Sequence, residues 1–467
     1  MKKARYINGL LAVIVAASLQ SCLVAKDYER PMQPSEELFR EAGVSKDTVS
    51  MATTPWSSFF TDPVLRTHIE TAISNNWDMR IALQNIAAAE SQFKQAKLGY
   101  APNVQADANW THQEIAKNSQ FGRLMANRSI DQYQATLGIS WEMDIWGKIR
   151  SQRRGAQAGF LQTVAAKQAI QTQLVANVAS VYLQLAAVDA QLKVVDSTLI
   201  NRRKSVEVIR ELMKAGETTA VGVKQTEAQL YATEITAADL RTRRTLLENN
   251  LRLLLGEGPG SIERSPIEQI KVTADLQTGL PAQLLQNRPD VMAAEFNLMR
   301  QFEMVNVARS AFYPSLTISG SGGFQSLELQ NWFSANALMA NVVTGLTQPI
   351  FNRRGIRTNL EVAKSNQEVA YLNFEKALVT AGKEVSDALA TYQNETEKLA
   401  IRDNHVTALR EAASYSEELL TYGMATYLEV LTAKDSALAS ELSRIDNQVN
   451  QYNALITLYR ALGGGWK

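Results

Sequence analysis

The chain contains one long pattern twice, at a constant offset of 207 positions. The stretch from Lys148 to Leu255 recurs from Arg353 to Leu462. Matched pairs include Val178 and Val385, Gly216 and Gly423, Val223 and Val430, Leu251 and Leu458, and Gly256 and Gly463. A single offset held over the whole stretch leaves no room for an insertion, which indicates an internal duplication. Any fold for this chain must therefore use the same unit twice.

Each copy predicts one very long helix, a turn and a shorter returning helix. No proline lies between Lys148 and Ala215, and apolar residues there recur at alternating spacings of three and four. They are Val178, Val181, Leu185, Val188, Leu192, Val195 and Leu199, followed after a miss at Arg202 by Val206, Ile209 and Met213. This 3.5-residue period is typical of a left-handed coiled coil, and the helix would be about 100 Å long. A helical bundle or a scaffold coiled coil would also show it.

Composition argues against several classes of protein. Lys and Arg number 48 and Asp and Glu number 47, so the net charge is +1 and gives no support for nucleic-acid binding. One cysteine and three widely spaced histidines (His68, His112 and His405) give little support for a disulfide framework or a metal site. The sequence has no phosphate loop and no Gly-x-Ser-x-Gly motif. We therefore predict no enzymatic activity, no cofactor and no bound metal.

The N-terminus is typical of an exported protein. Three basic residues among the first five precede an apolar run from Leu10 to Leu19, which is too short to span a bilayer. We predict a signal peptide over residues 1–21, lipidation at Cys22, and an extended tether over residues 22–62. Leu23, in place of aspartate after the cysteine, favours the outer membrane by resemblance to enterobacterial sorting. A plain signal peptide with an incidental cysteine is the alternative.

Two stretches in each copy alternate apolar and polar residues, as strands with two different faces do. They span residues 102–114 and 131–146 in the first copy, and about 314–325 and 336–350 in the second. In the clearest stretch the apolar positions are Tyr133, Ala135, Leu137, Ile139, Trp141, Met143 and Ile145. Its polar positions are Gln134, Thr136, Gly138, Ser140, Glu142 and Asp144. The chain is thus predicted to be mainly α with a small β part.

Two interpretations of these strands remain open. In a soluble protein the apolar face packs on a core, whereas in an outer-membrane barrel it meets lipid and the polar face lines water. We favour the barrel because the chain is exported and because the long helices leave no layer to cover a sheet. Interfacial aromatic residues would then be Trp110, Tyr133, Trp141 and Trp146. Lumen-facing charges would be Asp107, Glu142 and Asp144.

Four strands cannot close a barrel, since the smallest barrels have about eight. Open strand edges are prohibitive in lipid, so membrane insertion requires an oligomer. Two chains would give eight strands and three would give twelve, and spacing alone does not choose between them. A charged substitution on the lipid face would distinguish such a membrane barrel from a spacer without a pore. A spacer does not need the strands, so the substitution would have little effect on it.

The predicted helices have complementary lengths. The first repeat covers residues 63–270 and is predicted to have helices at 63–99, 148–215 and 220–255. The second repeat covers residues 271–467 and is predicted to have helices at about 281–312, 353–421 and 427–462. Two shorter helices end to end match one long helix, which suggests a hollow cylinder of helices. Its far tip would be formed by the turns at 214–219 and 421–426, with Gly216 and Gly423 in left-handed conformation.

Several motifs resemble the outer-membrane factor lipoproteins of tripartite efflux pumps, the TolC/OprM type or NodT-like family. They are the lipobox ending at Cys22, Tyr28-Glu29-Arg30-Pro31, the segment Trp56–Leu65, Asn287-Arg288-Pro289-Asp290, Ala308–Pro314 and the two tip motifs around Gly216 and Gly423. The resemblance covers nearly all of the mature chain. It implies a homotrimeric twelve-stranded transmembrane β-barrel that continues into a twelve-helix periplasmic α-barrel.

The resemblance also implies a function and partners. The chain would be a passive duct for export of small molecules from the periplasm, driven by an inner-membrane pump of the resistance-nodulation-division type through a periplasmic adaptor. Adaptor contact and gating would fall on Lys214, Gly216, Glu217, Thr218, Tyr422, Gly423, Met424 and Tyr427. Ala425 departs from the family, whose members often place an acidic gate residue there. A periplasmic coiled-coil structural or adaptor lipoprotein without a pore is the alternative function.

Overall fold

The computed structural model describes residues 24–31, 50–270 and 283–467. The predicted signal peptide, Cys22 and residues 32–49 of the predicted tether lie outside these ranges. The described residues form two compact units. Unit 1 contains residues 24–31, 86–162 and 294–373, and unit 2 contains residues 50–85, 163–270, 283–293 and 374–467. Each unit draws on both copies of the duplication, so compact units and sequence repeats do not coincide. The division into repeats at residue 271 stays a prediction.

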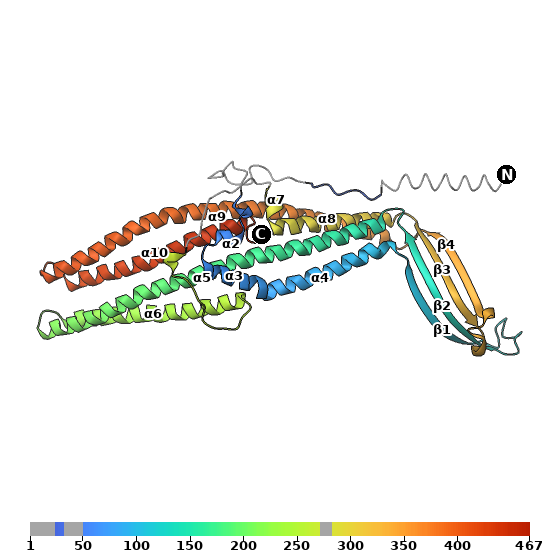
Figure 1. Cartoon of the computed structure of the whole chain (residues 1–467), viewed down its shortest axis with the longest axis horizontal. Coiled ribbons are helices and arrows are strands. Elements are labelled where there is room, and N and C mark those ends of the chain that lie inside the picture. Colours follow the sequence, from blue (N-terminus) through green and yellow to red (C-terminus); the bar gives the residue numbers. More distant parts are fainter. Residues whose placement is uncertain (1–23, 32–49, 271–282) are drawn as a thin grey trace. The chain divides into compact units, whose positions relative to one another are not determined.

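Unit 1 contains a four-stranded antiparallel sheet in the order β1-β2-β3-β4 (Figure 1). The strands are β1 (Asn103–Glu114), β2 (Ser129–Met143), β3 (Ser315–Ser326) and β4 (Leu338–Thr347). Each lies where the alternation of residues predicts it, with ends shifted by a few positions. Short 3-10 helices flank the strands: η4 (Leu98–Tyr100), η7 (Leu329–Asn331) and η8 (Ala335–Ala337). The two strand pairs of the duplication therefore form one sheet.

Helical segments of unit 1 pack closely beside the start of α5 (Lys148–Lys214). The rings of Phe93 on α4 (Trp77–Lys97) and Phe160 on α5 stack with centroids 6.1 Å apart. Gly155 allows α5 to approach α8 (Pro289–Ser310), because a Cβ at Gly155 would lie 2.6 Å from the terminal carbon of Met304. A larger residue at position 155 would force Met304 to move.

Unit 2 contains two helical hairpins whose turns lie at the same end of the unit (Figure 1). One hairpin pairs α5 with α6 (Ala220–Leu254), and the other pairs α9 (Gly355–Thr421) with α10 (Tyr427–Ala461). The predicted coiled-coil positions are buried except Met213, which is exposed. Four of them, Val188, Leu192, Val195 and Leu199, form a core cluster with Ala237 and Leu240 of α6. Leu438 and Leu442 of α10 pack against it. The 3.5-residue pattern therefore predicts the interface between helices correctly.

The N-terminal part of unit 2 has η3 (Met51–Thr53), α2 (Trp56–Phe59) and α3 (Pro63–Asn75). Asp62 caps α3, with a carboxylate oxygen that accepts the Leu65 N–H at 2.7 Å. Pro63 occupies the first turn, where its missing N–H costs nothing. The Phe59 ring stacks on Tyr459 with centroids 4.1 Å apart, so the aromatic segment is part of the core. A further 3-10 helix, η5, spans Ile267–Gln269.

The helix predicted over residues 63–99 is broken at Asn76, between α3 and α4, and this part of the prediction is wrong. The Asn76 side chain accepts the Asp78 N–H at 2.9 Å, as an N-cap residue does. Its amide nitrogen also donates to the Leu254 carbonyl oxygen at 3.0 Å. A residue that caps one helix and binds the end of another stabilises the break.

The helix predicted over 281–312 is likewise broken, into α7 (Leu284–Asn287) and α8. Arg288 precedes Pro289, which disfavours helical geometry at position 288. The Arg288 guanidinium donates to the Ala461 carbonyl oxygen at 3.0 Å. Leu254 and Ala461 are matched positions of the duplication. Each copy therefore joins its helix break to the end of its return helix, although Asn76 and Arg288 differ chemically.

Four glycines at matched positions end helices with positive φ: Gly216 (81°), Gly256 (75°), Gly423 (69°) and Gly463 (97°). At Gly423 the N–H donates to the Leu420 carbonyl oxygen at 3.0 Å, and the Met424 N–H donates to that of Leu419 at 2.9 Å. This is a Schellman motif, which satisfies carbonyl groups at a helix end. The predicted left-handed conformation of Gly216 and Gly423 is confirmed.

We expect Gly463→Ala to destabilise unit 2 more than Gly423→Ala. Both substitutions place a Cβ in the left-handed region, which costs about 1–2 kcal/mol. Around Gly423 the new Cβ would meet nothing within 4 Å, whereas at Gly463 it would lie 2.3 Å from the Asn287 carbonyl oxygen. Urea unfolding followed by circular dichroism gives both free energies. Equal losses would show that the Asn287 contact has no effect.

Candidate membrane-spanning sheet and hairpin tips

The sheet has one continuous apolar face. Strand pairing aligns Ala106 with Leu137, Leu137 with Gly322, and Gly322 with Ala340, so these residues share a face. Apolar side chains on this face are Val104, Ala106, Ala108, Trp110, Tyr133, Ala135, Leu137, Ile139, Trp141, Met143, Leu316, Ile318, Phe324, Leu338, Ala340, Val342 and Leu346. The same face also carries Thr344 and, beside the β1–β2 connection, the polar residues His112, Glu114, Ser129 and Asp131. Leu137 is 60% exposed and Val342 is 76% exposed, whereas leucine and valine side chains in a protein core are almost fully buried.

The opposite face of the sheet is mostly polar. It carries Asn103, Gln105, Asp107, Asn109, Thr111, Gln134, Thr136, Ser140, Glu142, Ser315, Thr317, Ser319, Ser321, Gln325, Met339, Asn341, Val343 and Thr347. A sheet with an exposed apolar face and a polar reverse face fits a barrel wall with lipid outside and water inside.

Within the described part of the chain, the outer edges of β1 and β4 pair with no other strand. These edges are twelve and ten residues long. In lipid each unpaired N–H or C=O group costs several kcal/mol, so a lone sheet of this kind cannot enter a membrane. A closed ring of copies, in which β1 of each copy pairs with β4 of the next, would satisfy both edges.

Aromatic side chains gather at both ends of the sheet. Near the β3–β4 connection, the Tyr133 ring lies 5.6 Å from that of Trp332, centroid to centroid. At the end nearer the helices, the Trp141 indole N–H donates to the Tyr100 carbonyl oxygen at 2.9 Å, and that of Trp146 donates to Pro314 at 2.8 Å. Aromatic belts of this kind are typical of the two interfaces of a membrane.

The predicted lumen-facing residues have different surroundings. Asp107 is exposed on the polar face and accepts a hydrogen bond from Gln105 at 3.1 Å. Glu142 binds the Lys148 ammonium group at 2.8 Å. Strand β2 ends at Met143, so the predicted strand end at residue 146 is wrong and Asp144 lies outside the strand. Its carboxylate instead caps α5, by accepting the N–H groups of Ile149 and Arg150 at 2.9 Å.

Most of the predicted tip residues are exposed. In the first hairpin Lys214, Gly216 and Glu217 are exposed and Thr218 is half-buried. In the second hairpin Tyr422, Gly423 and Met424 are exposed, with 70% and 77% exposure for the tyrosine and the methionine. Tyr427 is half-buried and follows Thr426, which forms a capping box with Glu429. Exposed apolar groups at a surface turn suit contact with another protein.

A cavity of about 660 Å³ lies between the two hairpins of unit 2. Its lining includes Leu212, Tyr427 and Lys434. Arg202 also lines this cavity, forms an ion pair with Asp435 of α10 and donates to the Gln229 carbonyl oxygen of α6 at 2.7 Å. Sequence reasoning did not assign Arg202 a role, although the interrupted apolar pattern at that position was a signal. A charged residue in a coiled-coil seam needs a partner.

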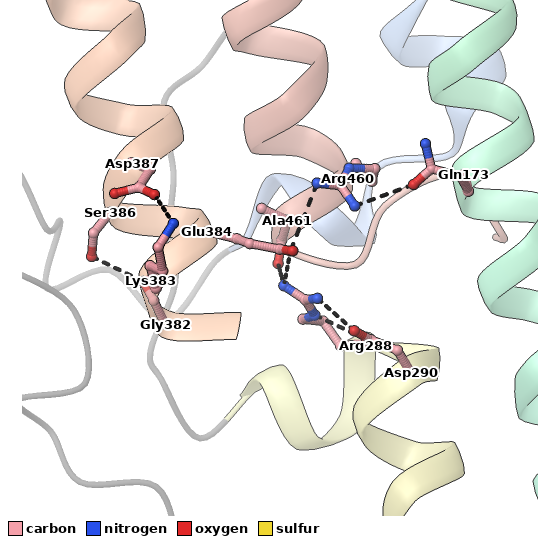
Figure 2. Close-up of polar contacts among 10 residues, drawn as sticks. All are labelled: Gln173, Arg288, Asp290, Gly382, Lys383, Glu384, Ser386, Asp387, Arg460 and Ala461. Atoms are coloured by element: carbon pink, nitrogen blue, oxygen red, sulfur yellow. Dashed lines mark hydrogen bonds and ion pairs between the residues drawn. The ribbon is translucent and has the colours of Figure 1, made fainter. Parts of the chain in front are cut away.

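The Asn287–Asp290 motif forms a polar cluster in unit 2, in which Asn287 and Arg288 are buried and Asp290 is exposed. Figure 2 shows Arg288 and Asp290 with their partners. The Arg288 side chain, 5% exposed, lies 2.9 Å from a Glu384 carboxylate oxygen and 3.0 Å from one of Asp290. Burial opposes the charge on Arg288, but Asp290 and Glu384 raise the pKa of its guanidinium. The Asn287 carbonyl oxygen accepts the Trp466 indole N–H at 2.9 Å. The motif thus joins α8, α9, α10 and the C-terminal residues.

We expect the stability of unit 2 to fall in acid, in part through Asp290. Burial would raise the pKa of this carboxyl, but the Arg288 guanidinium outweighs burial and lowers it below its usual value. The contribution is fully present above the unfolded aspartate pKa of about 3.9 and is lost as the pH falls through the lower folded value. The urea concentration at the unfolding midpoint should fall between pH 7 and pH 3, and this difference should be smaller for Asp290→Asn than for the unaltered chain. Equal differences would contradict this account.

Comparison with known proteins agrees with this geometry. A family model described as outer membrane efflux protein matches residues 68–257 and 280–464. The chain is 28% identical to the cation efflux system protein CusC of Escherichia coli O6:H1, over 98% of this chain and 99% of that one. It is 31% identical to the outer membrane protein OprJ of Pseudomonas aeruginosa, over 98% and 96%. The solved outer-membrane channel OprN superposes with a TM-score of 0.86 at 26% identity, covering 95% of this chain and all of that one.

The chain belongs to the outer membrane efflux protein family. Its relatives are outer-membrane efflux channels, so this chain is a channel component of an efflux system. The pore-free coiled-coil lipoprotein considered above finds no support in these comparisons. By length and composition α5 has an apolar window that would span a membrane, yet 67% of that window is buried inside the structure. The exposed sheet is therefore the better candidate for the membrane-spanning part.

Proposed function

We propose that three copies of this chain close one twelve-stranded barrel in the outer membrane. The barrel continues as a twelve-helix cylinder in the periplasm, and the assembly is a passive export duct. The observation that carries the proposal is the sheet, with its exposed apolar face and its two unpaired edges. Four strands need further copies to close, and the family resemblance favours three over two.

The finer assignments follow the same proposal. Cys22 carries the acyl anchor, which holds the chain at the membrane without spanning it. Asp107 and Glu142 face the lumen, where carboxylates favour cations near the wall. Lys214, Gly216, Glu217, Thr218, Tyr422, Gly423, Met424 and Tyr427 contact a periplasmic adaptor and take part in gating. The energy comes from an inner-membrane pump of the resistance-nodulation-division type, through that adaptor.

The cargo is selected mainly by the pump and not by the duct. Relatives of similar identity are named for different cargoes, which include cations for CusC and toluene for TtgF of Pseudomonas putida. A water-filled lumen lined by Asn, Gln, Ser and Thr side chains offers no pocket for one chemical class. The proposed substrates are therefore small molecules delivered by the pump.

Single-channel recording in planar lipid bilayers tests the duct. Purified protein should give discrete conductance steps, and Asp107→Asn with Glu142→Gln should lower the preference for cations without abolishing the steps. A pore whose tip is closed at rest would give no steps even if the duct is real. Asp435→Asn controls for this case, because it removes the ion pair with Arg202 that joins the two hairpins. Absence of steps from both the unaltered chain and Asp435→Asn would contradict a conducting pore.

A further inference from the structure

The connection between β3 and β4, residues 327–337, folds back over the apolar face of the sheet. The Trp332 ring lies 5.6 Å from that of Tyr133 and 4.9 Å from that of Phe333, centroid to centroid. The Phe333 ring in turn lies 5.5 Å from that of Phe324. Tyr133 and Phe324 belong to the apolar face, on neighbouring strands. These contacts place the connection on the side of the sheet that would meet lipid, and not on the side that would line the lumen.

The contact lies at a border within the apolar face. Tyr133 is paired with Trp110, and beyond this pair the same face carries the polar residues His112 and Asp131. Trp332 therefore packs where the face changes from apolar to polar. In a membrane protein this change marks the boundary between acyl chains and headgroups, where amphipathic aromatic rings are favoured.

The connection itself exposes apolar side chains. Leu327, Leu329 and Phe333 are exposed, the phenylalanine by 67%. Its one charged residue is Glu328, whose carboxylate accepts a hydrogen bond from the Gln330 side-chain amide at 3.2 Å. Exposed apolar side chains that continue an apolar membrane face fit contact with lipid better than contact with water.

The connection lies at the end of the sheet that is away from α8. Strand β3 begins shortly after α8 ends, and the connection follows the far end of that strand (Figure 1). In the proposed assembly the helices are periplasmic, so this end of the sheet reaches the outer leaflet of the membrane.

We propose that residues 327–337 form an interfacial clamp on the outer leaflet. Leu327, Leu329 and Phe333 insert among the acyl chains of the lipids there, and the two aromatic rings hold the clamp against the wall of the barrel. The partner is thus the acyl-chain region of the outer leaflet, and the connection is not a lid over the pore mouth. This inference rests on the barrel of the proposed function.

Collisions of a spin label with oxygen and with a water-soluble nickel chelate test the location of the clamp. The oligomer is placed in phosphatidylcholine vesicles with a label at Leu329→Cys, and labels at Leu137→Cys and Thr136→Cys serve as references for lipid and lumen. The unaltered chain, whose only cysteine is Cys22, gives the background. We expect the ratio of oxygen to nickel collisions at Leu329 to exceed that at Thr136 severalfold, as it should at Leu137.

Two other outcomes would contradict different claims. A ratio at Leu329 equal to that at Thr136, with a high ratio at Leu137, would place the connection in water, as a lid or a free loop, and overturn the clamp alone. A low ratio at Leu137 as well would overturn the barrel of the proposed function, and the clamp with it.

A second test asks whether the aromatic rings hold the clamp. Trp332→Ala with Phe333→Ala should lower the collision ratio at Leu329 severalfold, toward that at Thr136. Trp332→Phe is the matched control and should leave the ratio unchanged, because it keeps a ring against Tyr133. If the variant with two substitutions does not assemble, Tyr133→Ala removes the same contact from the side of the sheet. An unchanged ratio without these contacts would overturn the clamp.

Discussion

Leu137→Arg is expected to abolish assembly of the chain in the outer membrane. Leu137 lies in the middle of β2, at the centre of the apolar face, and is 60% exposed. An arginine on the lipid face of a barrel costs about 2–4 kcal/mol near the bilayer midplane. A trimer contains this cost three times, because each copy contributes the same strand. The amount of heat-modifiable oligomer in the outer-membrane fraction measures the effect.

Thr136→Arg is the matched control for this substitution. Thr136 is the next residue of the same strand, and its alignment with Asp107 and Gly323 places it on the polar face. An arginine there would meet water in the lumen, beside an aspartate, and assembly should be close to normal. Equal effects of the two substitutions would contradict the assignment of the faces. Normal assembly of Leu137→Arg would contradict the lipid face itself.

Arg288→Ala is expected to lower the free energy of unfolding of unit 2 by about 1.5–3 kcal/mol, the usual contribution of hydrogen bonds to charged groups, because the Asp290 and Glu384 carboxylates that lose their partner are in part exposed to water. The substitution removes the hydrogen bond to the Ala461 carbonyl oxygen and the closest cation to Glu384 and Asp290. Arg460 lies 3.7 Å from the same Glu384 oxygen and would compensate only in part. Urea unfolding followed by circular dichroism measures the loss.

Lys383→Ala is the control in the same region (Figure 2). Lys383 forms an ion pair with Asp387 one turn along α9, but both side chains are well exposed, at 70% and 60%. Exposed pairs at this spacing contribute about 0.3–0.5 kcal/mol. A loss for Arg288→Ala as small as that for Lys383→Ala would show that the cluster is dispensable. It would also remove our physical explanation for the Asn287–Asp290 motif.

Features that depend on local periodicity were predictable from the sequence. Val188, Leu192 and Val195 recur at coiled-coil spacing and lie in the core of the hairpins. Leu137 and Ile139 alternate with polar residues and lie on one face of the sheet. Gly216 and Gly423 end long helices and adopt the left-handed conformation that such ends favour. In each case the relevant neighbours are a few residues away along the chain.

Features that depend on distant residues were not predictable in this way. The helix break at Asn76 is stabilised by a hydrogen bond to Leu254, and the break at Arg288 by one to Ala461. Periodicity carries no information about such partners, so each pair of helices was predicted as a single helix. Asp144 continues the alternation of β2, yet the start of α5 binds its carboxylate and takes it out of the strand. Here a helix N-terminus outweighs the strand pattern.

The number of copies in the membrane-extracted protein tests the central claim most directly. Native mass spectrometry of the mature chain, extracted in detergent, gives that number together with the mass of any acyl group. A closed ring of either two or three copies would satisfy every edge of the sheet, and the family resemblance favours three, so we predict three copies. A monomer that stays in solution without detergent would mean that the apolar face packs on protein. That result would contradict both the duct and the assignment of the lumen-facing residues.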